Sequence, residues 1–282
     1  MTRPPFPARH AACALLFSLI SPSGWAEQQP LWEAGAGAAW IDFPKYRGSN
    51  ERRAYVLPVP YLNYNGEFLR VRRQSASGLI FRSENMELDI SVNGSVPSSS
   101  ADTPARSGMP NLDATAEIGP RLKFHLYYDE QQKTNLDLRL PMRPAFATDL
   151  SHFQHIGWVF QPQLNLDLDD VRRTRWNLGL AAGLVYADKR YNQYFYNVDP
   201  QYALPSRPAY SAAGGYSGYQ AIVSFSKRFP AYWTGGFLKW DNLSGAVFAG
   251  SPLVTSTHQF TFGWSIAWVL DKSERMVEVQ DD

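Results

Sequence analysis

Residues 86–93 read MELDISVN, and this short stretch decides the kind of protein that the sequence encodes. Every second residue is apolar, and the residues between are polar or charged. Because successive side chains of a β-strand point to opposite faces of the sheet, the pattern predicts a strand with one apolar and one polar face. The same alternation recurs in residues 134–143 (TNLDLRLPMR), 158–168 and 260–270.

Extended over the whole chain, this pattern predicts about twelve strands, within a range of ten to fourteen. They lie near residues 32–42, 54–64, 67–73, 77–82, 86–93, 114–128, 134–145, 155–168, 174–187, 217–228, 232–242 and 259–270. Most of them exceed the roughly 5–6 residues usual for strands of soluble sheets. They match the roughly 9–11 residues that a tilted strand needs to cross a bilayer.

The predicted connections fall into two length classes. If the N-terminus is periplasmic, the periplasmic turns are short: Asn65-Gly66, Ser83–Asn85, Asp129–Lys133, Asp169–Arg173 and Phe229–Ala231. All but one of the opposite connections are long and rich in Pro, Gly, Ser or Asn: residues 43–53, 94–113, 146–154, 188–216 and 243–258. Short turns on one side and long loops on the other are typical of outer-membrane proteins. The sequence therefore predicts an all-β fold, a closed antiparallel transmembrane β-barrel over residues 27–270.

Aromatic residues bracket the apolar faces of two predicted strands. Trp32 and Trp40 flank a run of alanines on one face, and Trp176 and Tyr186 flank an apolar row in the same manner. At about 3.3 Å per residue and a tilt of about 40°, the first pair lies roughly 20 Å apart across the membrane, near the ~25 Å apolar band of such barrels. We therefore expect these rings at the two membrane interfaces.

The first 26 residues predict a secretory signal. A basic start is followed by the mostly apolar run 11–20 and by small residues before Glu27. The single cysteine, Cys13, lies within this segment, so the mature chain is expected to lack disulfides and a thiol nucleophile. No later stretch approaches the ~18 apolar residues of a membrane-spanning helix. A periplasmic protein, a secreted protein and an outer-membrane barrel remain as alternatives.

Several segments resemble the MltA-interacting protein family, also called MipA/OmpV. They are Pro44–Ser49, Leu57–Tyr61, Arg106–Met109 with Leu112-Asp113, Glu117–Pro120, and Tyr191–Val198 followed by Ala203 and Tyr210. Each motif is short, but together they follow the family's order over nearly the whole mature chain. The resemblance implies an outer-membrane barrel that acts as a scaffold in murein synthesis, with a lytic transglycosylase and a penicillin-binding protein as partners. Other members are discussed as adhesion, osmotic-response or antibiotic-response proteins.

The chain departs from the usual pattern of such barrels at its C-terminus. Barrels of this class usually finish at an aromatic residue, whereas here residues 271–282 form a charged tail after the last predicted strand. We expect either an internal residue near Trp268 to serve as the assembly signal or the tail to form an extra periplasmic element.

A search for chemistry yields no catalytic, cofactor-binding or metal site. Lys and Arg number 27 against 26 Asp and Glu, so no basic excess points to nucleic acid. His152 and His155 form an H-x-x-H pair with only Asp149 close by as a third ligand, and we interpret them as solvated loop residues. Ser151 adjoins His152, but adjacent residues on an extended chain are poorly placed as nucleophile and base. The sequence therefore predicts a protein that is not an enzyme.

The polar faces of the predicted strands carry charges of both signs. They are Glu87, Asp89, Arg121, Lys123, Asp137, Arg139, Arg143 and Asp167. In a barrel these side chains point inward, where they form either a cross-strand ion lattice or the lining of a narrow pore. We expect a lumen that is mostly filled, or plugged by loops 94–113 and 188–216. The second loop is rich in tyrosine, which suits either recognition of a partner or packing over the barrel mouth.

Three functions follow, in order of preference. The first is a scaffold embedded among outer-membrane lipids that contacts murein enzymes through its periplasmic turns and tail. The second is a narrow channel for small solutes. The third is an outer-membrane lipid hydrolase using Ser151 and His152.

Overall fold

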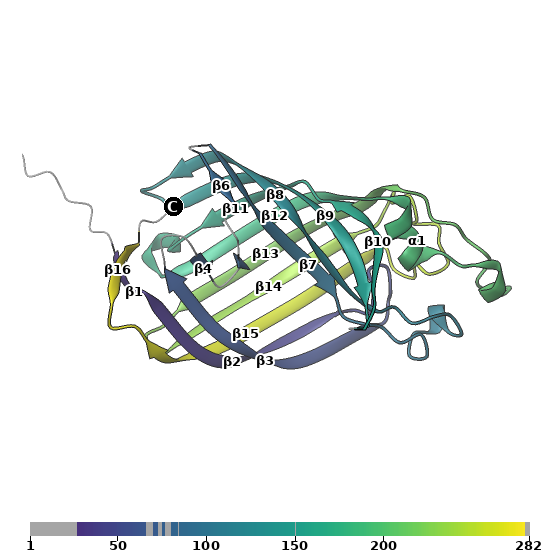
Figure 1. The fold of residues 1–282 in the computed structure, drawn as a ribbon, viewed down its shortest axis with the longest axis horizontal. Coiled ribbons are helices and arrows are strands. Elements are labelled where there is room, and N and C mark those ends of the chain that lie inside the picture. Colours follow the sequence, from purple (N-terminus) through teal and green to yellow (C-terminus); the bar gives the residue numbers. More distant parts are fainter. Residues whose placement is uncertain are drawn as a thin grey trace, which may run out of the picture.

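The computed structural model describes residues 27–65, 70–72, 75–76, 80–83, 85–149 and 151–279. One large antiparallel sheet curls into a barrel whose strands are tilted against its long axis (Figure 1). The predicted export signal, residues 1–26, lies outside the described residues.

The barrel wall is made of long strands. They are β2 (Trp32–Pro44), β3 (Arg52–Asn65), β7 (Met86–Ser95), β8 (Ala114–Asp129), β9 (Thr134–Thr148), β10 (Phe153–Phe160), β11 (Gln163–Leu168), β12 (Trp176–Ala187), β13 (Gly215–Arg228), β14 (Tyr232–Asn242) and β15 (His258–Lys272). Most pair with the next long strand in the chain, but β10 and β11 each pair with β9 and β12. In addition, β15 pairs with β2 over the register Lys272↔Glu33 to Phe262↔Asp42. This pairing joins the last long strand to the first, as a barrel requires.

The β2–β15 seam depends on a close approach of two backbones. A Cβ atom at Gly35 would collide with the carbonyl oxygen of Trp268, and one at Gly37 would collide with that of Ile266. Glycine is therefore the residue that lets these strands pair tightly.

Three predicted strands differ from their expected form. In place of strands at 67–73 and 77–82 the structure has β4 (Arg70–Arg72), β5 (Ser75–Ala76) and β6 (Phe81–Arg82), with residues 66–69, 73–74 and 77–79 outside the described part. In the order of hydrogen-bonded strands, β4 and β5 lie at one end of the sheet and β6 lies at the other end. The single strand predicted at 155–168 is split into β10 and β11 by Gln161 and Pro162, because proline has no N–H for the ladder.

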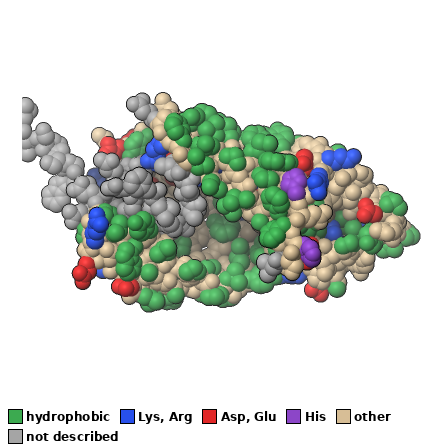
Figure 2. Space-filling model, in the orientation of Figure 1, with side chains coloured by type: hydrophobic (Ala, Val, Ile, Leu, Met, Phe, Trp, Pro, Cys, Tyr) green, Lys and Arg blue, Asp and Glu red, His purple; other side chains and the backbone are tan. Residues whose placement is uncertain are grey.

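Along the strands, most apolar side chains point outward and most polar or small side chains point into the lumen, as the sequence predicts. Apolar residues such as Trp40, Leu180 and Trp264 are 40%, 41% and 44% exposed on the outside, while their neighbours in the chain face the lumen and are less exposed. Figure 2 shows hydrophobic side chains over the middle of the barrel and charged side chains toward its two ends. In a membrane this outer band faces lipid.

The two ends of the barrel differ as expected from loop lengths. The long connections gather at one end together with η1 (Pro104–Arg106), α1 (Lys189–Tyr196) and η3 (Pro200–Tyr202) (Figure 1). The short turns 130–133, 169–175 with η2 (Val171–Arg173), and 229–231 lie at the other end. There β1 (Glu27–Pro30) pairs with β16 (Met276–Val279), so part of the charged tail forms a two-stranded sheet beside the barrel. Among the described residues, no helix has the length and apolar character of a membrane span.

Candidate functional site

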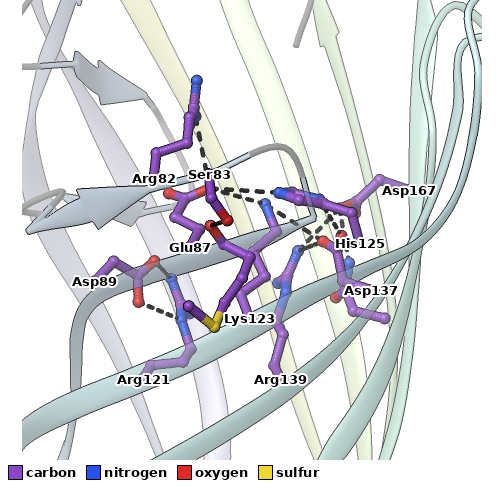
Figure 3. Close-up of polar contacts among 12 residues, drawn as sticks. Arg82, Ser83, Glu87, Asp89, Arg121, Lys123, His125, Asp137, Arg139 and Asp167 are labelled. Atoms are coloured by element: carbon purple, nitrogen blue, oxygen red, sulfur yellow. Dashed lines mark hydrogen bonds and ion pairs between the residues drawn. The ribbon is translucent and has the colours of Figure 1, made fainter.

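The lumen wall of β7, β8, β9 and β11 carries a lattice of charged side chains (Figure 3). Asp137 is completely buried at its centre, 3.5 Å from Lys123 Nζ and 3.1 Å from Arg139 Nη2. Arg139 also lies 3.1 Å from Asp167, and Lys123 lies 3.5 Å from Glu87. Because these strands are neighbours, alternate residues of one polar face meet across the ladder. The predicted ion lattice is confirmed.

The remaining predicted lumen charges are also paired. Arg121 Nε donates to Asp89 Oδ1 over 2.8 Å, and its guanidinium also contacts the second carboxylate oxygen. Arg143 Nε donates to Glu117 Oε2 over 2.9 Å. Ionised partners fix each other's orientation more strongly than neutral ones do. We therefore expect this wall to be rigid.

Glycine and alanine occupy part of the lumen face on two other strands, β12 and β2. On β12 the lumen phase places Gly179, Ala181 and Gly183, and on β2 it places Gly35 and Gly37. One longer-range contact crosses this part of the lumen face near the end of the barrel that holds the termini, where Arg228 Nη2 donates to Glu33 Oε1 over 2.8 Å. The lumen face is thus charged on β7, β8, β9 and β11. It carries small side chains on parts of β12 and β2, whereas β13 and β14 between them add Ile222, Phe237 and Lys239.

A belt of polar side chains encircles much of the lumen below the long loops. Arg143 Nη2 donates to Gln161 Oε1, Gln161 Nε2 to Gln220 Oε1, and Gln220 Nε2 to Asp241 Oδ1, each over 2.8 Å. Arg47 Nε donates to the same Asp241 oxygen over 2.7 Å. We call the residues Glu117, Arg143, Gln161, Gln220, Asp241 and Arg47 the polar belt.

The long loops pack above this belt into a cap with its own hydrophobic core. Phe248 is fully buried and stacks on Tyr196 of α1, with ring centroids 3.7 Å apart. The core further contains Tyr46, Leu112, Phe195, Ala212, Leu243 and Ala246, which come from all the long loops except 149–152. A hydrophobic cluster of this kind is found in soluble domains rather than in barrel lumens.

The cap is fastened to the belt at two points. Tyr191 of α1 donates its hydroxyl to Glu117 Oε1 over 3.0 Å. On the other side, Tyr196 donates to the carbonyl of Arg47 over 2.7 Å, and Arg47 itself reaches Asp241 and the carbonyl of Ser217. The cap and the lumen are therefore one hydrogen-bonded unit at this end.

Two further arginines hold the cap loops to each other. Arg106 Nη1 donates to the carbonyl of Phe195 over 2.9 Å, and Arg207 Nη1 donates to the carbonyls of Ala105 and Ser107 over 3.0 and 2.9 Å. Both arginine side chains are buried, so these backbone carbonyls supply partners for guanidinium N–H groups that are largely shielded from water.

Burial alters the acidity of the cap tyrosines. Burial raises the pKa of Tyr46 to about 12, partly offset by the nearby Arg106 guanidinium. The pKa of Tyr191 is also raised, by burial first and then by the Glu117 carboxylate. All of these hydroxyls therefore stay protonated at neutral pH and remain able to donate.

The residues considered for chemistry have ordinary structural contacts. The amides of Ser151 and His152 donate to Asp149 Oδ1 over 2.9 and 2.8 Å, which closes the loop between β9 and β10. His155 instead packs its ring against Phe146 and Trp158. Among the described residues, no group of three or more His, Cys, Asp or Glu is placed to hold a metal ion.

The structure also places residues whose role the sequence analysis missed. No helix was predicted within 188–216, although Asp188 accepts from the Tyr191 amide over 2.8 Å as an N-cap. Of the two roles considered for the tyrosines of this loop, packing over the mouth is the one seen for Tyr191 and Tyr196. The side chains of the belt residues Gln161, Gln220 and Asp241 all face the lumen. The alternating pattern of their strands already assigns them to that face, so it could have predicted that they lie in the lumen.

A basic turn marks the opposite end of the barrel. Between β11 and β12, Arg172, Arg173 and Arg175 all have positive φ, at 52°, 61° and 60°, and all are exposed. Asp170 holds the turn by accepting from the Arg175 amide over 2.6 Å. Left-handed backbone at non-glycine residues is costly and is retained where the surrounding contacts impose it.

Comparisons with known proteins agree with this architecture. The family described as "MltA-interacting protein MipA" matches residues 34–270. An outer membrane protein named YiaT, from Escherichia coli (strain K12), is 24% identical over 242 residues, which are 83% of this chain and 89% of that protein. The outer membrane protein OmpV of Vibrio cholerae is 30% identical over 90 residues, 31% of this chain and 34% of OmpV. Among solved structures, a bacterial polysaccharide outer membrane secretin aligns with a TM-score of 0.42 and 8% identity over 85% of this chain and 99% of its own.

Proposed function

The chain belongs to the family of the MltA-interacting protein MipA and lies in the outer membrane, and on that premise we propose that it is a scaffold for murein enzymes. In this role the barrel anchors the protein in the membrane. Its periplasmic turns and C-terminal segment hold a lytic transglycosylase and a penicillin-binding protein near each other.

The observation that carries the proposal is the cap fastened to the polar belt. Loops of a general diffusion channel leave a water-filled passage, whereas here buried aromatic rings and a continuous hydrogen-bonded belt occupy the extracellular mouth. A barrel closed in this way favours a role at its surfaces over a role in transport.

The β11–β12 turn supplies the clearest periplasmic contact surface. Its three arginines project from a turn whose backbone is fixed by Asp170, so the guanidinium groups are presented with little loss of backbone entropy on binding. Clustered arginines favour carboxylate-rich partners through paired hydrogen bonds. We therefore place the contact with an acidic surface of a murein enzyme at this turn.

A pull-down from native-host membranes tests the scaffold. The full chain would carry Arg172→Glu, Arg173→Glu and Arg175→Glu together, and the recovered transglycosylase and penicillin-binding protein would be quantified by mass spectrometry. We expect recovery to fall at least fivefold, because the reversed charges repel an acidic surface.

The matched control is charge reversal at the opposite end, Lys189→Glu with Arg190→Glu, which should leave recovery unchanged. Equal recovery with the wild-type chain and the triple variant, both shown to be folded by their gel migration before boiling, would contradict the scaffold at this turn.

A narrow channel remains the second candidate, favoured by one observation. The lumen face of β2 and β12 carries glycine and alanine, whose side chains take up less of the lumen than the charged side chains of β8 and β9 do. Planar-bilayer recordings separate the two functions. A reproducible conductance step that increases when Arg47→Ala releases the cap from Asp241 would favour the channel.

A further inference from the structure

Two exposed cations of α1 and one histidine of β10 form a basic cluster at the loop end of the barrel. Arg190 Nη1 lies 3.3 Å from His155 Nδ1, and Lys189 is the adjacent residue of the helix. Within the part of the chain that the structure describes, neither Lys189 nor Arg190 has a carboxylate within ion-pair distance. The nearest acid in sequence, Asp188, is engaged in capping the helix through the Tyr191 amide, and Asp149 pairs with His152.

The cluster sits where the lipid-facing band ends. The His155 ring packs edge-on against Phe146 and Trp158, with centroids 5.5 and 6.0 Å apart, and Trp158 is 43% exposed on the outer surface. In Figure 2 a histidine and a Lys or Arg side chain lie together over β10 and α1, at the border of the hydrophobic band. Cations at this level are placed to meet lipid headgroups rather than bulk solvent.

An apolar groove lies on the outer wall below the cluster. Its volume is 480 Å³, within the roughly 300–1,000 Å³ range of ligand sites. Its lining is Leu138, Pro162, Gln163, Leu164, Ala182, Gly183, Leu184, Tyr219, Gln220 and Ala221. Two features create it: the break between β10 and β11 at Pro162, and the small residues Ala182 and Ala221 on the lipid-facing phase of the neighbouring strands.

The distance in depth between the basic cluster and the groove is close to the thickness of one leaflet of the bilayer. Pro162 lies seven positions after His155 in the sequence. At about 3.3 Å per residue and a strand tilt of about 40°, this corresponds to roughly 18 Å of depth in the membrane. Half of a ~30 Å hydrocarbon core is about 15 Å. A lipid whose headgroup meets the cluster therefore has acyl chains that reach the groove.

We propose that this face binds one phosphorylated glycolipid of the outer leaflet, with a phosphate on Arg190 and Lys189 and an acyl chain in the groove. The unpaired positive charge calls for an anion, and the planar guanidinium of Arg190 suits a phosphate. The loop end of the barrel faces the cell exterior, so the leaflet at this depth is the outer one. The site is separate from the periplasmic surface of the proposed scaffold.

Binding would be measured with the purified full chain in detergent, by native mass spectrometry against defined lipids. The probes are diphosphorylated lipid A, its dephosphorylated form and phosphatidylglycerol. We expect lipid A to bind at least tenfold more tightly than either other lipid. The variant Lys189→Gln with Arg190→Gln should lose most of this preference, because it removes the charge that meets the phosphate.

Two further variants make the test specific. Ala182→Phe fills the groove and should weaken lipid A binding severalfold while leaving the preference for the phosphorylated form. Lys227→Gln removes an exposed-face cation near Trp176 at the other membrane interface and should change nothing. Equal binding of dephosphorylated lipid A or of phosphatidylglycerol, or an equal loss in the Lys227 variant, would overturn the proposal.

Discussion

The cap and the barrel wall of this protein are stabilised by opposite arrangements of the same kinds of side chain. In the cap, apolar rings such as Phe248 and Tyr196 are buried against one another, as in a small soluble domain. In the wall, apolar rings such as Trp264 face outward, and the inner face holds ion pairs around Asp137. The membrane, in place of a protein core, receives the apolar surface of the wall.

The two parts therefore obtain their stability from different sources. The cap depends on burial of side chains and on arginine bonds to carbonyls, so single core substitutions should loosen it locally. The wall depends on the backbone ladder, on lipid and on the lattice, so it should tolerate the loss of the cap.

Truncation of the central cap ring should have the largest effect. Phe248→Ala removes a fully buried ring and should destabilise the cap by about 3–5 kcal/mol. Hydrogen exchange should accelerate in α1 and in residues 243–257 but not in β12 to β15. Val247→Ala, at a position 37% exposed in the same loop, is the control and should change exchange little. Faster exchange of the barrel strands in the Phe248 variant would show that cap and wall are not separable.

A charged residue introduced on the outer face of the wall tests whether that face is in contact with lipid. Leu180→Arg places a cation near the middle of β12 on the lipid-facing phase and should cost about 2–4 kcal/mol of folding free energy in lipid vesicles. Ala181→Arg, one residue further on, faces the lumen and should cost less. Equal costs in denaturant titrations would refute the assignment of the two faces.

Alkaline pH should weaken the cap before the wall. Because burial raises the pKa of Tyr46 to about 12, the folded cap keeps this hydroxyl protonated while the unfolded chain ionises near pH 10. The contribution is fully present below pH 10 and is lost as the pH rises toward 12, on the order of 2–3 kcal/mol. A fluorophore on Val247→Cys would report cap opening, and Tyr46→Phe should remove this part of the pH dependence. An unchanged alkaline midpoint in that variant would contradict the assignment.

Removal of one lattice carboxylate should have the smallest effect. Asp137→Ala leaves Lys123 and Arg139 without their buried partner and should cost about 1–3 kcal/mol. Asp167→Ala removes a carboxylate whose side chain is 34% exposed, and its cost should be smaller. The comparison is read from denaturant midpoints in vesicles, and a larger cost for Asp167 would argue against a lattice centred on Asp137.

Much of the wall was predictable because its pattern is local. In β7 and β9 the side-chain face changes with every residue, so the alternating polarity of Leu88-Asp89 or Leu136-Asp137 identifies lipid and lumen directly. The exceptions are places where hydrogen bonding overrides polarity. Pro162 divides a strand that alternation alone predicts to be continuous, and the short strands near residues 70–82 carry too few residues for a period to be read.

The barrel, its two faces, the separation of short turns from long loops and the charges that line the lumen can all be predicted from the amino-acid sequence, because each depends on residues that are neighbours in the chain. The packing of the loops into a cap, and the polar belt that fastens it, become visible only in the three-dimensional arrangement of the strands. Arg47 and Asp241 are 194 residues apart, and Tyr191 and Glu117 are 74 apart. Contacts over such separations depend on how the curved sheet brings its strand ends together, and no local period of the sequence encodes that.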